Sequence, residues 1–241
     1  MRLDYIGEMF RLLPICVLFL FAYVPVVRAQ YGLGTWNILS SSAKLSDKSS
    51  LYTEAQLRSL MFYSNFHYYE FKGGISRKIT NDFSLLGGIG RYDTYSPGGD
   101  FKSPRLTREI RTWAQANLRN TLGRWTVEHR YRAEQRFTDR GYRNRFRYRI
   151  AVSLPINGEK PGSGVWVLNL WNEVFFTNRA PYYERNRIFG GMGYGLSELI
   201  TIQLGYLYQF DYRLVDEIGR DFLQVGVYFT PDWRNTMQTT E

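Results

Sequence analysis

The sequence predicts an all-β fold, an antiparallel up-and-down transmembrane β-barrel of about 10–12 strands. Three observations lead to this fold class. The chain begins with a segment typical of a secretory signal peptide. Many later segments alternate apolar with charged residues at a period of two, the period of a strand. Aromatic residues, 17% of the chain, gather at the ends of these segments, where membrane barrels carry interfacial girdles.

Residues 1–29 form the expected signal peptide, cleaved after Ala29. Two arginines precede the apolar run Ile15–Val27, and Val27-Arg28-Ala29 is a small-residue cleavage pattern just before Gln30. An uncleaved membrane anchor is the alternative, but the run is shorter than the roughly 20 residues that a spanning helix needs, and Pro25 interrupts it. The single cysteine, Cys16, lies inside this segment without small residues before it. The mature chain is therefore expected to have neither a disulfide nor a lipid anchor.

Charge is the second global feature. The chain has 31 Lys and Arg against 22 Asp and Glu, a formal net charge of +9. Such an excess attracts polyanions, among them nucleic acid, lipopolysaccharide and acidic lipid. A secreted chain does not normally meet nucleic acid, so that partner is not expected. Beyond the signal, no apolar run is long enough for a transmembrane helix. We expect a barrel over residues 30–230 and a C-terminal tail over 231–241.

The clearest strands are residues 124–137 and 143–154. In the first, charged residues at even positions, with Thr126, alternate with a mainly apolar and aromatic set at odd positions. In the second, arginines occupy the odd positions from Arg143 to Arg149, and the even positions are largely apolar. A helix would scatter both sets around its circumference, so both segments are predicted strands.

The same pattern identifies the other segments in order along the chain. With the two above they make eleven candidates: 33–45, 51–63, 68–79, 83–95, 106–119, 124–137, 143–154, 165–177, 184–196, 200–212 and 221–229. Tight turns are expected at 46–48, 81–82, 122–123 and 197–198, and longer connections at 96–105, 157–164 and 214–220. Proline cannot donate to a strand ladder, and every proline after the signal falls in a connection or at a strand end. Single-chain bacterial barrels have an even number of strands, so one of the breaks is expected to be misplaced.

Two interpretations of these strands are possible. A soluble sandwich packs its apolar face inward, whereas an outer-membrane barrel presents it to lipid and lines its lumen with polar residues. Strand lengths of about 9–11 residues or more match a tilted membrane strand. The last segment alternates Leu223, Val225, Val227 and Phe229, similar to the closing strand that the outer-membrane assembly machinery reads, although residues continue past it. The expected protein is a monomer of the bacterial outer membrane that contacts membrane lipid, lipopolysaccharide and that machinery.

A family resemblance supports the same fold. The blocks that carry it are Gly34–Trp36, Glu54–Arg58, Phe66–Glu70, Glu128–Arg132, Arg143–Arg149, Asn172–Phe176, Glu184–Arg187, Gly205-Tyr206 and Gln209-Phe210. They resemble an uncharacterised family of predicted bacterial outer-membrane β-barrel proteins, known only as a domain of unknown function. The resemblance extends over nearly the whole mature chain and implies no activity.

The polar face of these strands predicts a network inside the barrel. If the turns centre on 122–123 and 140–141, Glu134 lies opposite Arg111 and Arg147, Arg136 opposite Glu109, and Arg132 opposite Arg149. The expected network comprises Glu54, Arg58, Glu70, Glu109, Arg111, Glu128, Arg130, Arg132, Glu134, Arg136, Arg145, Arg147, Arg149, Glu173, Arg185, Arg187 and Asp211. It can be a structural plug, because unpaired buried charges are costly, or a narrow conduit whose surplus arginines prefer anions.

Other activities find less support. His129 falls on the lipid face, where a lipid-modifying hydrolase of the membrane would place its base, but its expected neighbours, Ala114 or Ala116 and Phe146, Tyr148 or Ile150, include no serine. His67 is expected in an aromatic girdle. Two histidines on separate segments predict no metal site, and the glycine clusters lack the spacing of nucleotide loops. We therefore expect no catalytic residues and no cofactor. A soluble secreted β-protein that binds polyanions remains an alternative, and it would purify without detergent.

Overall fold

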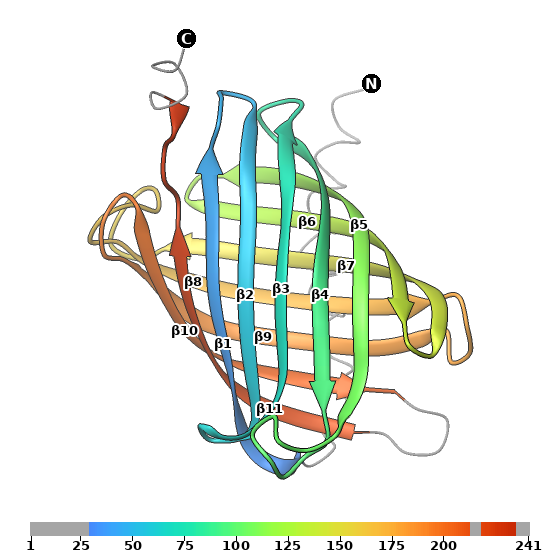
Figure 1. The fold of residues 1–241 in the computed structure, drawn as a ribbon. Coiled ribbons are helices and arrows are strands. Elements are labelled where there is room, and N and C mark those ends of the chain that lie inside the picture. Colours follow the sequence, from blue (N-terminus) through green and yellow to red (C-terminus); the bar gives the residue numbers. More distant parts are fainter. Residues whose placement is uncertain (1–28, 213–217, 235–241) are drawn as a thin grey trace, which may run out of the picture.

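The computed structural model describes residues 29–212 and 218–234. Within them eleven strands form one closed barrel (Figure 1). Their bounds are β1 (Ala29–Lys44), β2 (Ser49–Met61), β3 (Ser64–Lys78), β4 (Phe83–Tyr95), β5 (Arg105–Leu122), β6 (Trp125–Thr138), β7 (Gly141–Pro155), β8 (Trp166–Thr177), β9 (Tyr183–Gly195), β10 (Ile200–Asp211) and β11 (Ile218–Phe229). No helix in the described part of the chain has the length and hydropathy needed to cross a membrane. The predicted all-β barrel is confirmed, and all but one of its strand pairs are antiparallel.

Strand parity differs from the expectation. Consecutive strands pair antiparallel, and β1 closes the barrel against β11 in parallel, with Thr35 beside Leu223 and Ser41 beside Phe229. An odd number of strands makes the first and last run in the same direction, so their pairing must be parallel. The eleven predicted segments are thus eleven strands, and the expected even count was wrong. In Figure 1, β1–β5 stand upright in front while β6–β10 cross behind them, as in a barrel with steeply tilted strands.

The connections between strands lie at the two ends of the barrel. At the C-terminal end lie the connections 45–48, 79–82, 123–124, 156–165 and 196–199, and β11 ends there. Arg234 binds Asp47 in the first of these turns at 2.5 Å and also binds Asp232. The hydrogen bond from Arg234 lowers the pKa of Asp232 to about 2. At the opposite end, 62–63 and 139–140 connect strands with only two residues each, so short connections occur at both ends of the barrel.

Two strand registers differ from the predicted ones by two residues. Gly123-Arg124, rather than Leu122-Gly123, forms the turn after β5, because Leu122 pairs with Trp125. Gly123 has φ +59°, a conformation that glycine adopts without steric cost. The next turn lies at 139–140 instead of 140–141, because Thr138 pairs with Gly141.

These shifts change the partners of the predicted pairs. Glu134 lies opposite Trp113 and Arg145, and Arg136 lies opposite Arg111. Arg132 lies opposite Arg147 instead of Arg149. A shift of two residues leaves each side chain on the same face of the sheet, so the predicted inward set is unchanged while its direct partners are different.

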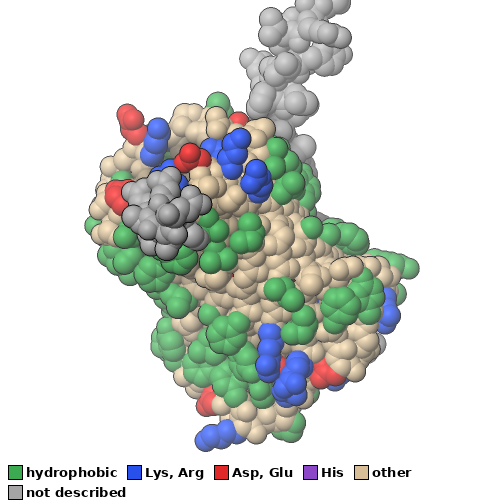
Figure 2. All heavy atoms as spheres, turned by 45° about the horizontal axis from the view of Figure 1, so that its top comes forward, with side chains coloured by type: hydrophobic (Ala, Val, Ile, Leu, Met, Phe, Trp, Pro, Cys, Tyr) green, Lys and Arg blue, Asp and Glu red, His purple; other side chains and the backbone are tan. Residues whose placement is uncertain are grey.

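The barrel is apolar outside and charged inside. Phe71, Ile89 and Leu204 on the outer face are more than half exposed, whereas Glu134 and Arg145 on the inner face are only 2% exposed. Figure 2 shows hydrophobic side chains over much of one face, with charged side chains gathered toward its two ends. This distribution is the reverse of that in a soluble barrel.

Part of the interior is apolar. Trp36, Phe189, Leu207 and Phe222 form a buried cluster on the side of the barrel closed by β1 and β11. The rings of Trp36 and Phe222 meet edge to face with centroids 5.5 Å apart. Gly205 on β10 makes room for this cluster, because a Cβ there would lie 2.5 Å from the ring of Phe189 and 2.6 Å from a backbone oxygen. The interior is thus filled on this side by large side chains.

We expect Gly205→Ala to lower the free energy of unfolding by about 1–3 kcal/mol, the usual cost of overpacking a filled core. The control is Gly190→Ala, whose added methyl meets the tip of the Leu170 side chain at 3.3 Å, a contact that a small rotation relieves. Urea unfolding in detergent micelles measures both variants. Equal stability of the two would show that the interior around Phe189 is not tightly packed.

Candidate functional site

The inward positions of β2 to β10 carry the charged residues that the sequence singled out. All of them lie inside the barrel, and most are less than 10% exposed: Glu54, Arg58, Glu70, Glu109, Arg111, Glu128, Arg130, Arg132, Glu134, Arg136, Arg145, Arg147, Arg149, Glu173, Arg185, Arg187 and Asp211. Glu128, Arg149 and Arg185 keep about a fifth of their side chains accessible. The period of two along each strand places these side chains on one face of the sheet. Closure of the barrel encloses that face, so side chains from different strands meet inside it.

Glu134 is the centre of the network. Its carboxylate receives Arg145 at 2.6 Å and Arg147 at 2.7 Å, and Arg132 lies at 3.8 Å. The predicted pairing of Glu134 with Arg147 therefore occurs, although as a diagonal contact between neighbouring strands. Arg145 is the direct cross-strand partner, which the predicted register missed. One carboxylate thus neutralises parts of three guanidinium groups in a site without solvent access.

The same pattern extends across five strands. Arg145 also binds Glu184 on β9 at 3.2 Å, and Arg147 also binds Glu173 on β8 at 2.9 Å. On the other side, Glu184 binds Arg136 at 3.4 Å, and Arg136 in turn binds Glu109. Cations and carboxylates therefore alternate in one continuous chain from β5 to β9. Such a chain satisfies buried charges that would be costly alone.

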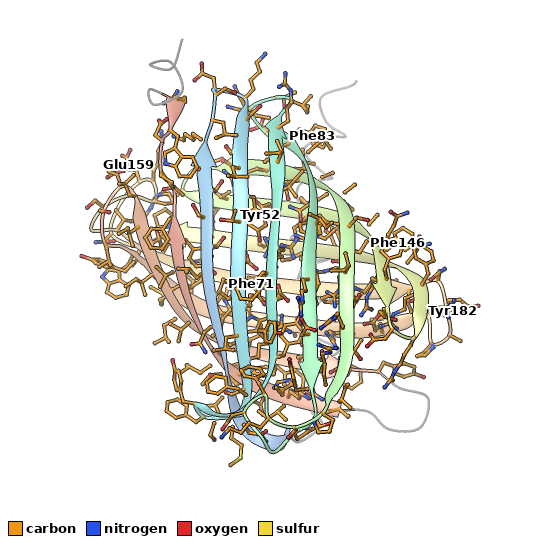
Figure 3. The ribbon with its side chains drawn as sticks, viewed as in Figure 1. Tyr52, Phe71, Phe83, Phe146, Glu159 and Tyr182 are labelled. Carbon is orange, nitrogen blue, oxygen red and sulfur yellow. The ribbon has the colours of Figure 1, made fainter. Side chains whose placement is uncertain are left out.

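A second cluster joins β2 and β3. Lys72 binds Glu54 at 2.5 Å and Glu70 at 2.6 Å, and Arg58 binds Glu70 at 3.1 Å. The hydroxyl of Tyr52, labelled in Figure 3, donates to Glu54 at 2.6 Å. Lys72 and Glu184 belong to the interior network but were not among its predicted members. Lys72 follows the period of Glu70 and could have been found, but a register irregularity between Phe175 and Phe176, beside β9, hides the position of Glu184.

Aromatic rings take part in the network. Phe175 is fully buried, and the guanidinium groups of Arg147 and Arg187 lie 4.6 and 4.7 Å from its ring centre. Arg58 lies 3.4 Å above the ring of Trp36. Cation–π contacts of this kind are stronger where water is excluded. They add to the ion pairs that the same guanidinium groups make, Arg147 with Glu134 and Glu173 and Arg58 with Glu70.

The interior carries more cations than carboxylates. The carboxylates include Glu54, Glu70, Glu109, Glu128, Glu134, Glu173, Glu184 and Asp211, and the cations include Arg58, Lys72, Arg111, Arg130, Arg132, Arg136, Arg145, Arg147, Arg149, Arg185 and Arg187. Arg132 and Arg187 donate to the amide oxygens of Gln115 and Gln209, at 2.7 and 2.9 Å. A surplus of positive charge therefore remains in the interior.

A polar hollow opens at the end of the barrel opposite the C-terminus. Its volume is about 340 Å³, and its charged lining comes from Arg143, Arg179, Arg185, Glu184 and Asp211. It lies beside the connection 178–182 and leads toward the Glu184 part of the network. Its chemistry suits a small anion, because the arginines outnumber the carboxylates.

The placement of the two histidines agrees with the expectation only in part: Ile150 is one of the neighbours expected for His129, whereas Leu118 is not. His129 pairs with Leu118 and Ile150, not with Ala114 or Ala116, and its Nδ1 lies 2.8 Å from the Tyr148 hydroxyl. No serine occupies these pairing positions. His67 is only 8% exposed, so it does not belong to an exposed girdle. Over residues 29–212 and 218–234, no three His, Cys, Asp or Glu side chains form a group that could hold a metal ion.

Comparison with known proteins gives a family without an assigned activity. Residues 33–217 match the model of a family described as Protein of unknown function (DUF2490). Neither the curated proteins nor the solved structures contain a match to this chain.

Proposed function

This chain belongs to the DUF2490 family of unknown function. We propose that it is an integral β-barrel of a bacterial outer membrane and that its ion-paired interior is closed. The role that this geometry supports best is structural. The barrel is a stable, non-conducting membrane protein that presents loops on both sides of the membrane.

The inverted distribution of polarity carries this proposal. Large apolar side chains such as Leu39, Phe146 and Tyr206 are more than half exposed on the outer face, while Glu173 and Arg145 are 2% exposed inside. In water, exposed apolar side chains and buried charged side chains are both unfavourable. In a hydrocarbon environment, apolar side chains on the outer face are favourable, and charged side chains have to lie inside. A soluble barrel that binds polyanions would need the opposite arrangement of faces.

Closure of the interior is supported by how its charges are satisfied. The chain of ion pairs from Glu109 to Glu173 spans five strands, and the apolar cluster around Phe189 fills the other side. Removing a partner from such a chain leaves a buried charge that costs several kcal/mol. An open water-filled lumen would not need this degree of pairing.

The residue pattern of β11 supports one orientation of the barrel in the membrane. Its outward residues Leu223, Val225 and Val227 lead to Phe229 at the end of the strand, the pattern expected for the strand that the assembly machinery reads. We place the C-terminal end on the periplasmic side and the opposite end, with the hollow beside 178–182, at the cell surface.

A narrow anion-preferring conduit is the second candidate. The surplus of cations in the interior and the arginine-lined hollow at the cell-surface end favour it. In this interpretation an anion enters past Arg143 and Arg185 and moves along the network, displacing carboxylates from their partners in turn.

Cell fractionation tests the membrane location. We expect the full-length chain, expressed in a Gram-negative host, to be found in the outer-membrane fraction and to require detergent for extraction. Unheated samples are expected to migrate differently from boiled samples in gel electrophoresis, as folded barrels do. Purification as a soluble protein without detergent would contradict the proposal and favour a secreted polyanion-binding protein.

Planar-bilayer recording separates the two candidates. With a heat-modifiable barrel inserted, we expect no steady conductance steps, because paired side chains fill the interior. Steady anion-selective steps would overturn the closed barrel and support the conduit. In that case the double variant Arg145→Gln/Arg147→Gln should reduce anion selectivity, and Arg77→Gln, at the exposed C-terminal rim, should leave it unchanged.

A further inference from the structure

The outer wall of the barrel carries one charged group that the interior network does not explain. Three arginines converge on Asp93 near the cell-surface end of β4 and β5. Arg91 binds one carboxylate oxygen at 2.6 Å, and Arg105 and Arg108 lie 3.8 and 3.7 Å from the other oxygen. Asp93 itself is fully buried beneath them. One carboxylate therefore holds three guanidinium groups together.

These residues face outward. Arg91 pairs with Phe71 and Ile110, and Asp93 pairs with Tyr69 and Arg108. Phe71, labelled on β3 in Figure 3, is 59% exposed. Because directly paired residues lie on the same face of a sheet, the arginines share the wall on which these apolar side chains are exposed. In the proposed membrane location, this wall faces lipid.

The positive charge of the group is not neutralised within the protein. Beside it, Asp139 accepts from the backbone N–H of Arg108 at 2.9 Å, and Arg140 extends toward the carbonyl of Leu106. With these neighbours included, arginines still outnumber carboxylates by two to one. The side chains of Arg91 and Arg108 remain 47% and 50% exposed. Guanidinium groups with free N–H donors are thus held at the outer surface.

An apolar groove begins at this group. It has a volume of about 690 Å³ and runs across the outer wall from β5 and β4 to β1 and the end of β11. Small outward residues, Ser41, Thr53, Ala55 and Gly73, form its floor, and larger apolar residues flank it. Arg91 lines it as well. The groove therefore has an apolar length and a cationic side chain on its wall.

Aromatic residues mark the depth of the arginines. Tyr69, Tyr95 and Phe101 pack together beside Asp93, with the ring of Phe101 5.5 Å from Tyr69 and 5.3 Å from Tyr95. Tyrosines occupy the boundary between hydrocarbon and headgroups in membrane barrels. The guanidinium groups beside them are at the level of lipid headgroups, and the groove extends toward the acyl chains.

We propose that Arg91, Arg105 and Arg108 bind a phosphate group of lipopolysaccharide and that the groove takes one of its acyl chains. Guanidinium groups form paired hydrogen bonds with phosphate oxygens, and Asp93 preorganises the three heads for that contact. The proposal rests on the proposed function, because only the outer-membrane location and the chosen orientation bring this end of the barrel to the leaflet that carries lipopolysaccharide.

Native mass spectrometry of the detergent-solubilised barrel tests the proposal with three probes: lipid A, dephosphorylated lipid A and a zwitterionic phospholipid. We expect the wild-type chain to retain lipid A at least tenfold more strongly than either other lipid. The double variant Arg91→Gln/Arg108→Gln is expected to lose this preference. Arg77→Gln, which removes an exposed arginine at the far end of β3, is the matched control and should bind like wild type.

The outcomes separate the lipid site from the membrane location. Heat-modifiability of the same samples reports whether each variant is a folded barrel. Equal retention of lipid A and dephosphorylated lipid A by a folded wild-type barrel would overturn the phosphate site and leave the membrane location intact. Unchanged binding by the folded double variant would also overturn it. A chain that is soluble without detergent would instead contradict the proposed function.

Discussion

Replacing Glu134 with leucine is expected to lower the free energy of unfolding of the barrel by about 3–5 kcal/mol, the usual cost of breaking a buried ion pair. Glu134 is 2% exposed and accepts from Arg145 and Arg147. Its removal leaves two buried guanidinium groups with fewer partners, and leucine offers no acceptor. Urea unfolding in micelles measures the difference in free energy between the variant and the wild type, with the loss of heat-modifiability as the signal of unfolding.

Two further substitutions identify the cause of this loss. Glu134→Gln preserves the volume of the side chain and removes the charge, so it should also be destabilising, although less than the leucine variant. Glu128→Leu breaks the pairs with Arg149 and with the exposed Arg119, both at 3.2 Å near the rim, and should cost about 1 kcal/mol. Wild-type stability of Glu134→Leu would contradict the view that ion pairs hold the interior together.

If the barrel spans a membrane as proposed, Leu204→Arg is expected to cost about 2–4 kcal/mol and to impair assembly, because it places a charge on the lipid-facing wall away from the strand ends. Leu204 lies in the middle part of β10 and is 53% exposed. In a soluble barrel the same substitution would add a charge to a hydrated surface and would be nearly neutral. The amount of folded protein in the outer-membrane fraction measures the effect.

Leu122→Arg is the matched control for depth. Leu122 is the last residue of β5 and is 75% exposed. An arginine at this level reaches the headgroups, so its expected cost is about 0–1 kcal/mol. Equal tolerance of both substitutions would contradict the membrane location, and a large loss at the rim with tolerance at Leu204 would contradict the assignment of the membrane-embedded zone.

The extent of the network shows what sequence periodicity can and cannot predict. Arg143, Arg145, Arg147 and Arg149 are assigned to one face by alternation alone, because a strand has only two faces. Which carboxylate meets which arginine depends on the turns. Each of the two turns lies one residue away from its predicted position, so the observed registers of β5 with β6 and of β6 with β7 differ from the predicted ones by two residues. The direct partner of Glu134 is therefore Arg145. A shift of two residues leaves every side chain on the same face, so the alternating pattern cannot reveal it.

Periodicity alone located the eleven strand segments, although not their odd number, and it assigned the charged residues of the interior to one face of the sheet. These properties are local, because they follow from the period of two and from where turns and prolines interrupt it. Three features become visible only in the folded barrel: the parallel closure of β1 on β11, the ion pair between Glu184 and Arg145, and the convergence of three arginines on Asp93. Each of these depends on register irregularities, strand tilt and barrel closure, which bring together residues that are distant along the chain and leave no periodic signal in it.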